Sequence, residues 1–126
     1  MGLVKEVMKE IGNKSREFYE FVLPPIDMHL NEDSLKVVID IPGFAKKDIE
    51  LTLCGDVLSI KAEKEIQKKE SDSLICNQRP NVIDKKVRLP IDIKVGEEKI
   101  ESAKYVDGIL TLVIPFTKSG KNISID

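Results

Sequence analysis

The fold of this chain is decided by the stretch Ile100-Glu101-Ser102-Ala103-Lys104-Tyr105-Val106-Asp107-Gly108-Ile109-Leu110-Thr111-Leu112-Val113-Ile114. Two apolar runs flank Asp107-Gly108, and Asp-Gly in that position is among the strongest short signals for a β-hairpin, because both residues tolerate a positive φ. In the second run, the side chains of Leu110, Leu112 and Ile114 share one face. Ile109 and Val113 lie on the other face. We therefore predict a hairpin whose second strand is covered on both faces.

Alternating polarity also runs through the earlier part of the chain. Leu35–Ile41, Ile49–Cys54 and Leu58–Ala62 alternate apolar and polar side chains, which is typical of half-buried strands. Gly55-Asp56 has the composition of a tight turn between the second and third strands. Pro42-Gly43-Phe44 interrupts the ladder after the first, because proline has no N–H to donate and glycine accepts unusual φ values. We predict that these three strands run as a meander.

A further strand is predicted from Val82 to Leu89, and the segment from Ile91 to Glu98 is predicted to be a loop. Short strands at turn-marked intervals, without helices between them, indicate a β-sandwich. A chain of 126 residues has the length of one domain with tails. We predict a sandwich domain over residues 24–116, an N-terminal helical arm over residues 1–23 and a C-terminal tail over residues 117–126.

The N-terminal arm has the spacing of an amphipathic helix between Leu3 and Phe21, since apolar residues recur every three or four positions. Gly12-Asn13 should fray this helix in the middle, because both residues disfavour helix interiors. Pro24-Pro25 should end it. A helix of this length is marginal in water unless its apolar stripe is buried. The stripe consists of Val4, Val7, Met8, Ile11, Phe18 and Phe21.

The connection after the third strand is unusually long for a compact domain. Residues from Glu63 to Asp72 are almost all charged or polar, and they lead to the short apolar island Leu74-Ile75-Cys76. One interpretation is a solvated loop. The other is an arm whose island pairs with a second subunit, and the isolated apolar triplet favours this second interpretation.

Composition argues against several classes of function. Lys+Arg 20 against Asp+Glu 22 gives a formal charge of -2, and the basic residues are scattered, which argues against a nucleic-acid or anionic-membrane partner. No apolar run approaches the roughly 20 residues of a membrane span. Charged residues such as Lys5 and Glu10 interrupt the N-terminal segment, so it lacks the apolar run of an export signal. We expect a cytoplasmic protein.

Residues with catalytic or metal-binding chemistry are sparse. His29 is the only histidine, and no cysteine near it completes a zinc set. Cys54 and Cys76 lie far apart in the sequence, so we interpret them as reduced apolar fillers. The acid pair Glu97-Glu98 lies in a predicted turn, where solvated charge is commoner than an acid/base pair. With no phosphate-binding loop, nucleophile elbow or catalytic triad in the sequence, we expect neither a metal, a cofactor nor an enzymatic activity.

Four motifs occur in the order known from one family. The segment from Ala103 through Gly108 to Leu110 resembles the A-x-x-x-n-G-v-L signature of the α-crystallin domain of small heat-shock proteins, with Asp107 where Asn is more usual. Ile41-Pro42-Gly43-Phe44 resembles the P-G turn of that family, and Arg88-Leu89-Pro90 fits its pattern as well. Ile123-Ser124-Ile125 is similar to its C-terminal I-x-I anchor. The resemblance covers about residues 24–126.

The resemblance implies an all-β, immunoglobulin-like sandwich that assembles as dimers and then as larger homo-oligomers. It also implies an ATP-independent holdase, which binds unfolding client proteins and passes them to ATP-dependent chaperones. The island Leu74-Ile75-Cys76 is implied to exchange between subunits and to pair with the segment around Ile26 and Met28 of its neighbour. The I-x-I anchor is implied to dock in a groove of another dimer, here lined by Ile49, Leu51, Leu53, Ile100 and Ala103.

Ile123 and Ile125 should form a weak and reversible contact. Burying both side chains contributes roughly 3–6 kcal/mol gross. Ordering the polar tether from Thr117 to Asn122 and losing subunit freedom cost a comparable free energy. Many tails in one particle bind together, because each undocked tail then meets its groove at high effective concentration. We expect an oligomer that is cohesive but exchanges subunits.

Two alternatives to the holdase interpretation remain. The chain could be a co-chaperone-like interaction module for one specific partner, with the tail at Ile123 and Ile125 folded onto its own sheet edge. It could also serve a structural role in assembly without binding clients. The apolar stripe of the N-terminal helix has the same two interpretations. Met and Phe suit promiscuous contact with clients, yet the stripe could equally serve only contacts within an oligomer.

Overall fold

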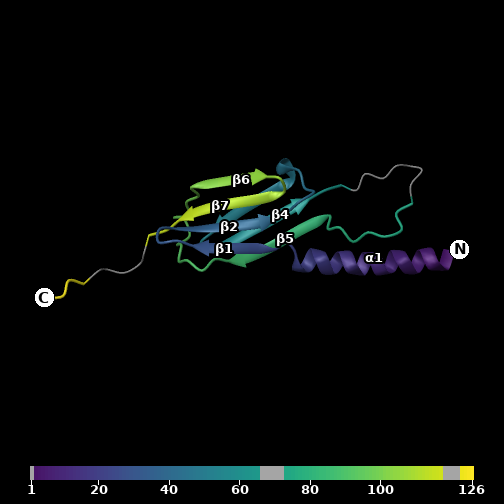
Figure 1. Ribbon diagram of the computed structural model, residues 1–126, viewed down its shortest axis with the longest axis horizontal. Helices are drawn as coiled ribbons and strands as arrows, with labels where there is room; N and C mark the ends of the chain where they lie inside the picture. The colour runs from purple at the N-terminus through teal and green to yellow at the C-terminus, as the bar shows by residue number, and fades with distance from the viewer. Residues whose placement is uncertain (1, 66–72, 118–122) are drawn as a thin grey trace.

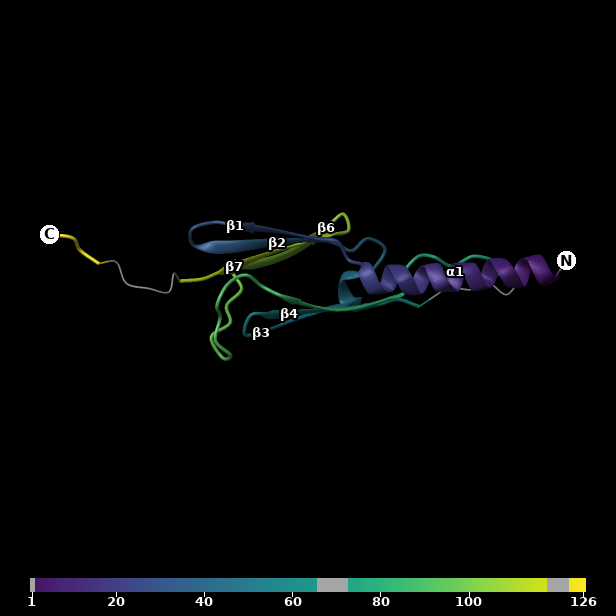
Figure 2. The same ribbon diagram turned by 90° about the horizontal axis from the view of Figure 1, so that it is seen from below.

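The computed structural model describes residues 2–65, 73–117 and 123–126 (Figure 1). Within these residues, seven strands form two antiparallel sheets, of order β1-β2-β7-β6 and β3-β4-β5. Figure 2 shows these sheets as two stacked layers, which confirms the predicted β-sandwich. The elements are α1 (Gly2–Val22), β1 (Ile26–Leu30), β2 (Ser34–Asp40), the 3₁₀ helix η1 (Lys46–Asp48), β3 (Ile49–Cys54), β4 (Val57–Glu63), β5 (Val82–Arg88), β6 (Ser102–Val106) and β7 (Ile109–Pro115).

The core lies between the inner faces of the two sheets and is almost wholly aliphatic. Period-two alternation places every second side chain of β2, β4 and β7 inward, so that each strand contributes three buried residues. Each fully buried Leu, Ile or Val contributes about 1.5–3 kcal/mol to the hydrophobic driving force. The buried residues of β2, β4 and β7 are Leu35, Val37, Ile39, Leu58, Ile60, Ala62, Leu110, Leu112 and Ile114.

The predicted hairpin forms between β6 and β7. Asp107 has φ 53° and Gly108 has φ 78°, so both turn residues adopt the left-handed conformation that the Asp-Gly pair was expected to supply. The prediction that β7 is covered on both faces was wrong, because Ile109 is exposed and Val113 is only half-buried. The helix does not lie across this face, since α1 extends beyond the end of the sandwich (Figure 1).

The predicted three-stranded meander was also wrong. The chain leaves β2, passes through Pro42-Gly43-Phe44 and η1, and enters the other sheet at β3. Pro42 and Gly43 mark an interruption of the ladder in either arrangement, so local sequence did not distinguish a hairpin from a change of sheet. Of the three strands predicted to form the meander, only β3 and β4 pair as expected, across the turn at Gly55-Asp56.

Helix α1 runs without a break from Gly2 to Val22, so the predicted fraying at Gly12-Asn13 was wrong. Gly12 is instead a buried residue of this helix, packed against the segment of Cys76 and Asn77. That contact explains how the helix tolerates a glycine in its interior. The predicted end of the helix is confirmed, because α1 stops at Val22, before the two prolines.

The turn of the hairpin is held against the crossover between the sheets. The Ile41 amide donates to the Gly108 carbonyl oxygen at 2.8 Å. The Tyr105 hydroxyl lies 3.0 Å from the carbonyl oxygen of Ile41 and 2.8 Å from that of Phe44, so its single proton is shared between them. A Cβ atom added to Gly108 would lie only 3.0 Å from Pro42. The signature motif and the P-G motif, distant in the sequence, therefore meet in one contact.

Both cysteines differ from the expectation that they fill apolar space. Cys54 at the end of β3 and Cys76 beside α1 are free and exposed. Residues of β3 alternate between half-buried and exposed positions, and Cys54 falls on the exposed side.

Replacing Gly108 with Ala should destabilise the fold more than replacing Gly96 with Ala. Both glycines have positive φ, 78° and 95°, so both substitutions carry a conformational cost of roughly 1–2 kcal/mol. Only the Gly108 substitution also presses on Pro42, since nothing lies within 4 Å of a Cβ at Gly96. Chemical denaturation of the two variants measures the difference, and equal losses of stability would contradict the Gly108–Pro42 contact.

Candidate functional site: apolar interaction surfaces

Strand β1 is one edge of the four-stranded sheet. Ile26 and Met28 are partly buried and pack against the core, and they pair with Ile39 and Val37 of β2. The other side of β1 presents its backbone N–H and C=O groups outward, as edge strands do, and such a row can pair with another chain. The segment predicted to accept a neighbour's strand is therefore an edge strand.

Strands β3 and β6 are edges of the two different sheets. β1 and β5 occupy one side of the sandwich (Figure 1), which places β3 and β6, at the far ends of the two strand orders, on the other side. Ala103 pairs with the buried Leu112 and so faces inward, yet it is exposed. Ile100 precedes β6 and is 45% exposed. The inner faces are incompletely covered at this side of the sandwich.

The groove residues predicted on β3 are also apolar residues at a sheet edge that are only partly covered. Ile49, Leu51 and Leu53 are half-buried and pack against the core from the edge of their sheet. The structure thus brings apolar residues from two distant parts of the sequence, the β3 set and the β6 set, to one side of the sandwich.

The tail is not buried on its own subunit. Ile123 is 87% exposed and Ile125 is 93% exposed. The C-terminal end of the chain lies away from the sandwich, on the side opposite to α1 (Figure 1). The tail therefore does not close an edge of its own sheets in this structure. The tether residues 118–122 lie outside the described part of the chain.

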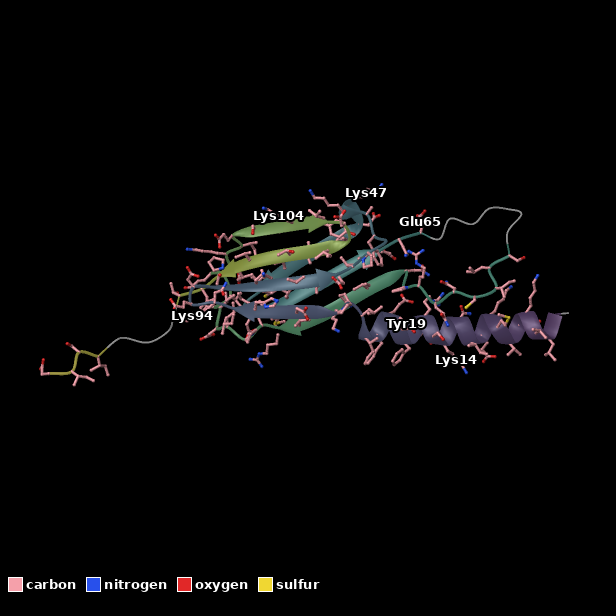
Figure 3. All side chains as sticks on the ribbon, in the orientation of Figure 1. Lys14, Tyr19, Lys47, Glu65, Lys94 and Lys104 are labelled. Atoms are coloured by element: carbon pink, nitrogen blue, oxygen red, sulfur yellow. The ribbon has the colours of Figure 1, made fainter. Side chains whose placement is uncertain are left out.

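The apolar stripe of α1 is exposed as well. Figure 3 shows side chains standing out along the helix beyond the end of the sandwich. The exposed fraction reaches 84% for Phe21 and 74% for Leu3. Every residue of the predicted stripe is exposed: Val4, Val7, Met8, Ile11, Phe18 and Phe21. The sandwich of the same chain does not provide the burial that an amphipathic helix requires.

The island Leu74-Ile75-Cys76 is not a strand in this subunit. It runs as an extended segment beside α1 (Figures 1 and 2). Leu74 is 41% exposed and Ile75 is 38% exposed. Residues 66–72 of the preceding excursion lie outside the described residues.

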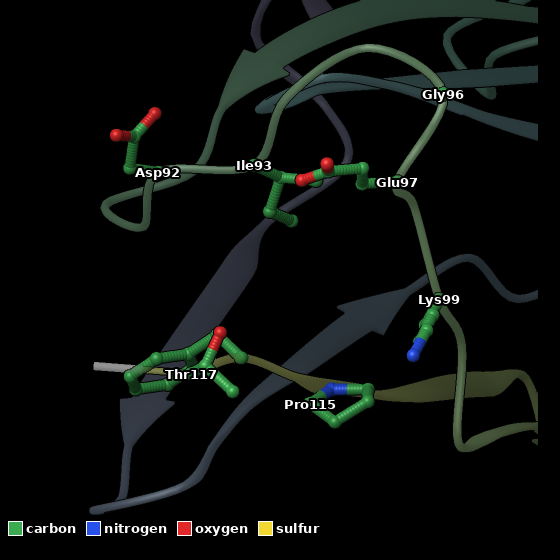
Figure 4. Close-up of a pocket in the computed structure, with 8 residues that line it drawn as sticks. Asp92, Ile93, Gly96, Glu97, Lys99, Pro115 and Thr117 are labelled. Carbon is green, nitrogen blue, oxygen red and sulfur yellow. The ribbon is translucent and has the colours of Figure 1, made fainter. Parts of the chain in front are cut away.

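A cavity that sequence reasoning missed lies at the end of β7. It has a volume of about 530 Å³ and separates the loop after Leu89 from the end of β7 (Figure 4). The sequence predicted only a loop here. The residues that line the cavity come from two segments that meet in the fold, so the cavity itself could not be predicted. The lining residues are Asp92, Ile93, Gly96, Glu97, Lys99, Pro115, Phe116 and Thr117.

Glu98 fixes this loop to the β3–β4 turn. Its carboxylate accepts a hydrogen bond from the Gly96 amide at 2.7 Å and from the Gly55 amide at 3.2 Å. The hydrogen bond from Gly96, and to a smaller extent that from Gly55, lowers the pKa of Glu98 below its usual range. Sequence reasoning had assigned Glu98 only to solvated charge, since its partner Gly55 is distant in the sequence. The contact positions the loop beside the edge that contains β3.

Within residues 2–65, 73–117 and 123–126, no group of three or more His, Cys, Asp or Glu side chains could hold a metal ion. Over the same described residues, no helix has both the length and the apolarity needed to cross a membrane.

The chain is similar to known proteins over most of its length. The Hsp20/alpha crystallin family matches residues 27–126. A solved structure of a point mutant of hsp14.1 from Sulfolobus is 42% identical, with a TM-score of 0.71, over 80% of this chain and 84% of that one. Small heat shock protein C2 of Rickettsia felis is 26% identical over 122 residues, which cover 87% of this chain and 77% of the relative.

Some relatives are much longer than this chain. The mitochondrial 26.5 kDa heat shock protein of Arabidopsis thaliana is 30% identical over 117 residues, which cover 86% of this chain but only 49% of the plant protein. The chloroplastic small heat shock protein of Solanum lycopersicum is covered over 41% of its length. The chain spans less than half the length of these two plant relatives.

Replacing Glu98 with Gln should lower the thermal stability at pH 7, and the loss should shrink in acid. A carboxylate whose folded pKa is lowered stabilises the fold above its unfolded pKa, about 4.3, and this stabilisation disappears as the pH falls through the folded value. Thermal unfolding of both proteins between pH 7 and pH 3 measures the gap. Glu97→Gln is the matched control, and a gap for Glu98→Gln that stays constant with pH would contradict the assignment.

Proposed function

Because the chain belongs to the Hsp20/alpha-crystallin family, we propose that it is an ATP-independent holdase, which binds unfolding proteins and prevents their aggregation. Members of this family are small heat-shock proteins, generally ATP-independent chaperones rather than enzymes. One observation carries the proposal for this chain. Its sandwich is closed around an aliphatic core, yet its helix, tail and sheet edges keep apolar side chains exposed.

The helix stripe is the proposed client-binding surface. Unfolding proteins present apolar side chains in no fixed geometry, so a surface that binds them must adapt. Met8 has a flexible, polarisable side chain, and Phe18 and Phe21 each offer a large apolar area. Since α1 projects beyond the sandwich, the stripe can reach a client without rearrangement of the core (Figure 1). The same stripe serves contacts between subunits when no client is present.

The tail is the proposed link between dimers. Ile123 and Ile125 are exposed, while the side of the sandwich between β3 and β6 leaves inward-facing apolar residues uncovered. Two isoleucines fit this complementary surface on another subunit, as the I-x-I resemblance implies. Since one such contact is weak, assembly depends on many tails together and remains reversible.

Strand exchange is the proposed basis of the dimer. The island Leu74-Ile75-Cys76 pairs with the free edge of β1 on a neighbouring subunit, and main-chain hydrogen bonds then join the two chains. In this proposal residues 1–23 contact clients, residues 24–116 form the dimerising sandwich and residues 117–126 connect dimers. Delivery of clients to ATP-dependent chaperones belongs to the same proposal.

A client aggregation assay without nucleotide tests the holdase function. Light scattering of a heat-unfolding client should stay low at equimolar subunit concentration. Replacing Phe18 and Phe21 with Ser should weaken this protection several-fold, because most of the aromatic area of the stripe is lost. Lys14→Ser on the same helix is the matched control. Unchanged client aggregation in the presence of the unmodified protein would contradict the proposal.

Replacing Ile123 and Ile125 with Ser should convert large oligomers to dimers without unfolding the sandwich. Both side chains are exposed in the subunit, so their loss removes no contact within the core. Sedimentation velocity measures the size and thermal unfolding measures the fold. Ser124→Ala is the control that leaves both isoleucines in place, and an unchanged sedimentation profile for the double variant would refute the anchor.

Replacing Leu74 and Ile75 with Asp should yield monomers, because two charges in an exchanged strand oppose its burial on β1. Chemical cross-linking and native mass measurement report the dimer. Ser73→Asp adds a charge beside the island but retains its apolar side chains, so this control should remain dimeric. A dimer of normal stability in the double variant would show that the island does not exchange.

A further inference from the structure

The surface of α1 at Gly12 is fitted to the island segment of its own chain. A Cβ atom built on Gly12 would lie 2.8 Å from the backbone nitrogen of Asn77 and 3.2 Å from Cα of Cys76. Gly12 is also a buried residue of α1. Backbone can approach the helix axis this closely only where no side chain intervenes. The glycine that sequence reasoning treated as a defect is thus a contact site.

Polar contacts extend this arrangement along the helix. The Val82 amide at the start of β5 donates to Glu20 Oε2 at 3.0 Å, and Arg16 Nε lies 3.1 Å from Glu20 Oε1. The Lys85 ammonium group donates to the Val22 carbonyl oxygen at 3.1 Å. The segment from Leu74 to Val82 therefore follows α1 toward its C-terminal end, as Figures 1 and 2 show.

The docked segment uses the side of α1 that the apolar stripe does not use. Successive residues turn by about 100° around a helix axis, so Gly12, Arg16 and Glu20 fall on a side roughly opposite to Val7 and Phe18, while Met8, four residues before Gly12, lies at the border between the two sides. The stripe stays exposed while the segment is docked. Client contact and segment docking are thus compatible on one helix.

The docked position is a poor environment for the island. Leu74 and Ile75 line a cavity of about 230 Å³ together with Lys9, Asn13 and Asn77, so their apolar side chains face polar ones across imperfect packing. Pairing with an edge strand would instead satisfy the backbone groups of the island and bury both side chains. The contact with α1 is therefore one that a better partner can displace.

We propose that the Gly12 side of α1 is a docking site in cis for residues 74–77, which holds the island on its own subunit until strand exchange opens the contact. This inference rests on the strand exchange proposed above. It makes dimerisation a competition between α1 of the same chain and β1 of the neighbour. When the island leaves, the polar side of α1 becomes free as well, so dimer formation changes the surroundings of the helix.

A reversible covalent lock tests the proposal. In a Cys54→Ser background, Gly12→Cys places a second thiol beside Cys76, whose Sγ lies 3.3 Å from the Cβ position at residue 12. Oxidised glutathione takes up two electrons as the two thiols lose their protons and form the disulfide. The locked protein should lose at least about tenfold in dimer affinity, and reduction should restore it. Mass measurement verifies that the disulfide is intramolecular.

A locked protein that dimerises as well as its reduced form would overturn the docking proposal. The variant with both Leu74→Asp and Ile75→Asp distinguishes a failure of strand exchange from a failure of docking in cis. If that variant also dimerises, strand exchange itself is wrong. If it is monomeric while the locked protein dimerises, strand exchange stands and only docking in cis is refuted.

Gly12→Ala supplies a second test without a cross-link. The added methyl group would lie 2.8 Å from the Asn77 backbone nitrogen, so the segment must shift and the docked state is weakened while helix propensity improves. Gly12→Cys carries the same Cβ atom, but there the disulfide holds the shifted segment beside the helix. We expect the dimer dissociation constant to fall about tenfold, which corresponds to about 1.4 kcal/mol. Gly2→Ala is the control, because nothing lies within 4 Å of its Cβ. An unchanged dissociation constant for Gly12→Ala would contradict docking.

Discussion

The structure depends on one constraint, which is that each sheet has a single aliphatic face and must bury it against the other. β2, β4 and β7 supply the middle of this core, and their alternate side chains leave almost no inward surface exposed. The burial weakens toward the edges, because β1, β3 and β6 each have a neighbour on only one side. Apolar surface at these edges is the direct consequence of closing a sandwich from two open sheets. Their positions are where the proposed contacts with other copies form.

The stretch at the β6–β7 hairpin connects this core to the crossover between sheets. Gly108 allows the turn to approach Pro42, and the Tyr105 hydroxyl holds the carbonyl groups on either side of that proline and its glycine. The crossover in turn directs the chain into β3, whose edge is one side of the proposed anchor groove. In the proposed assembly, a local turn preference thus positions one side of the anchor groove.

Much of the fold could be predicted from periodicity and turn chemistry. Asp107-Gly108 predicted its hairpin because the information is local, and the period of two marked β2, β3 and β4. The change of sheet after β2 and the role of Gly12 could not be predicted, since each depends on what lies opposite in space. The role of Glu98 could not be predicted for the same reason, because it depends on a contact with Gly55. The apolar residues of the candidate surfaces were found by pattern, while their exposure required the structure.

Hydrogen exchange of backbone amides tests most directly whether neighbouring subunits cover the exposed apolar surfaces. In the assembled protein, amides of Leu74–Cys76 and of the free side of β1 should exchange slowly, as should those around Ile123 and Ile125. Dilution to dissociated subunits should make these amides exchange rapidly, while the buried strands β2, β4 and β7 stay protected. Rapid exchange at the island, β1 and the tail at every concentration would contradict the account.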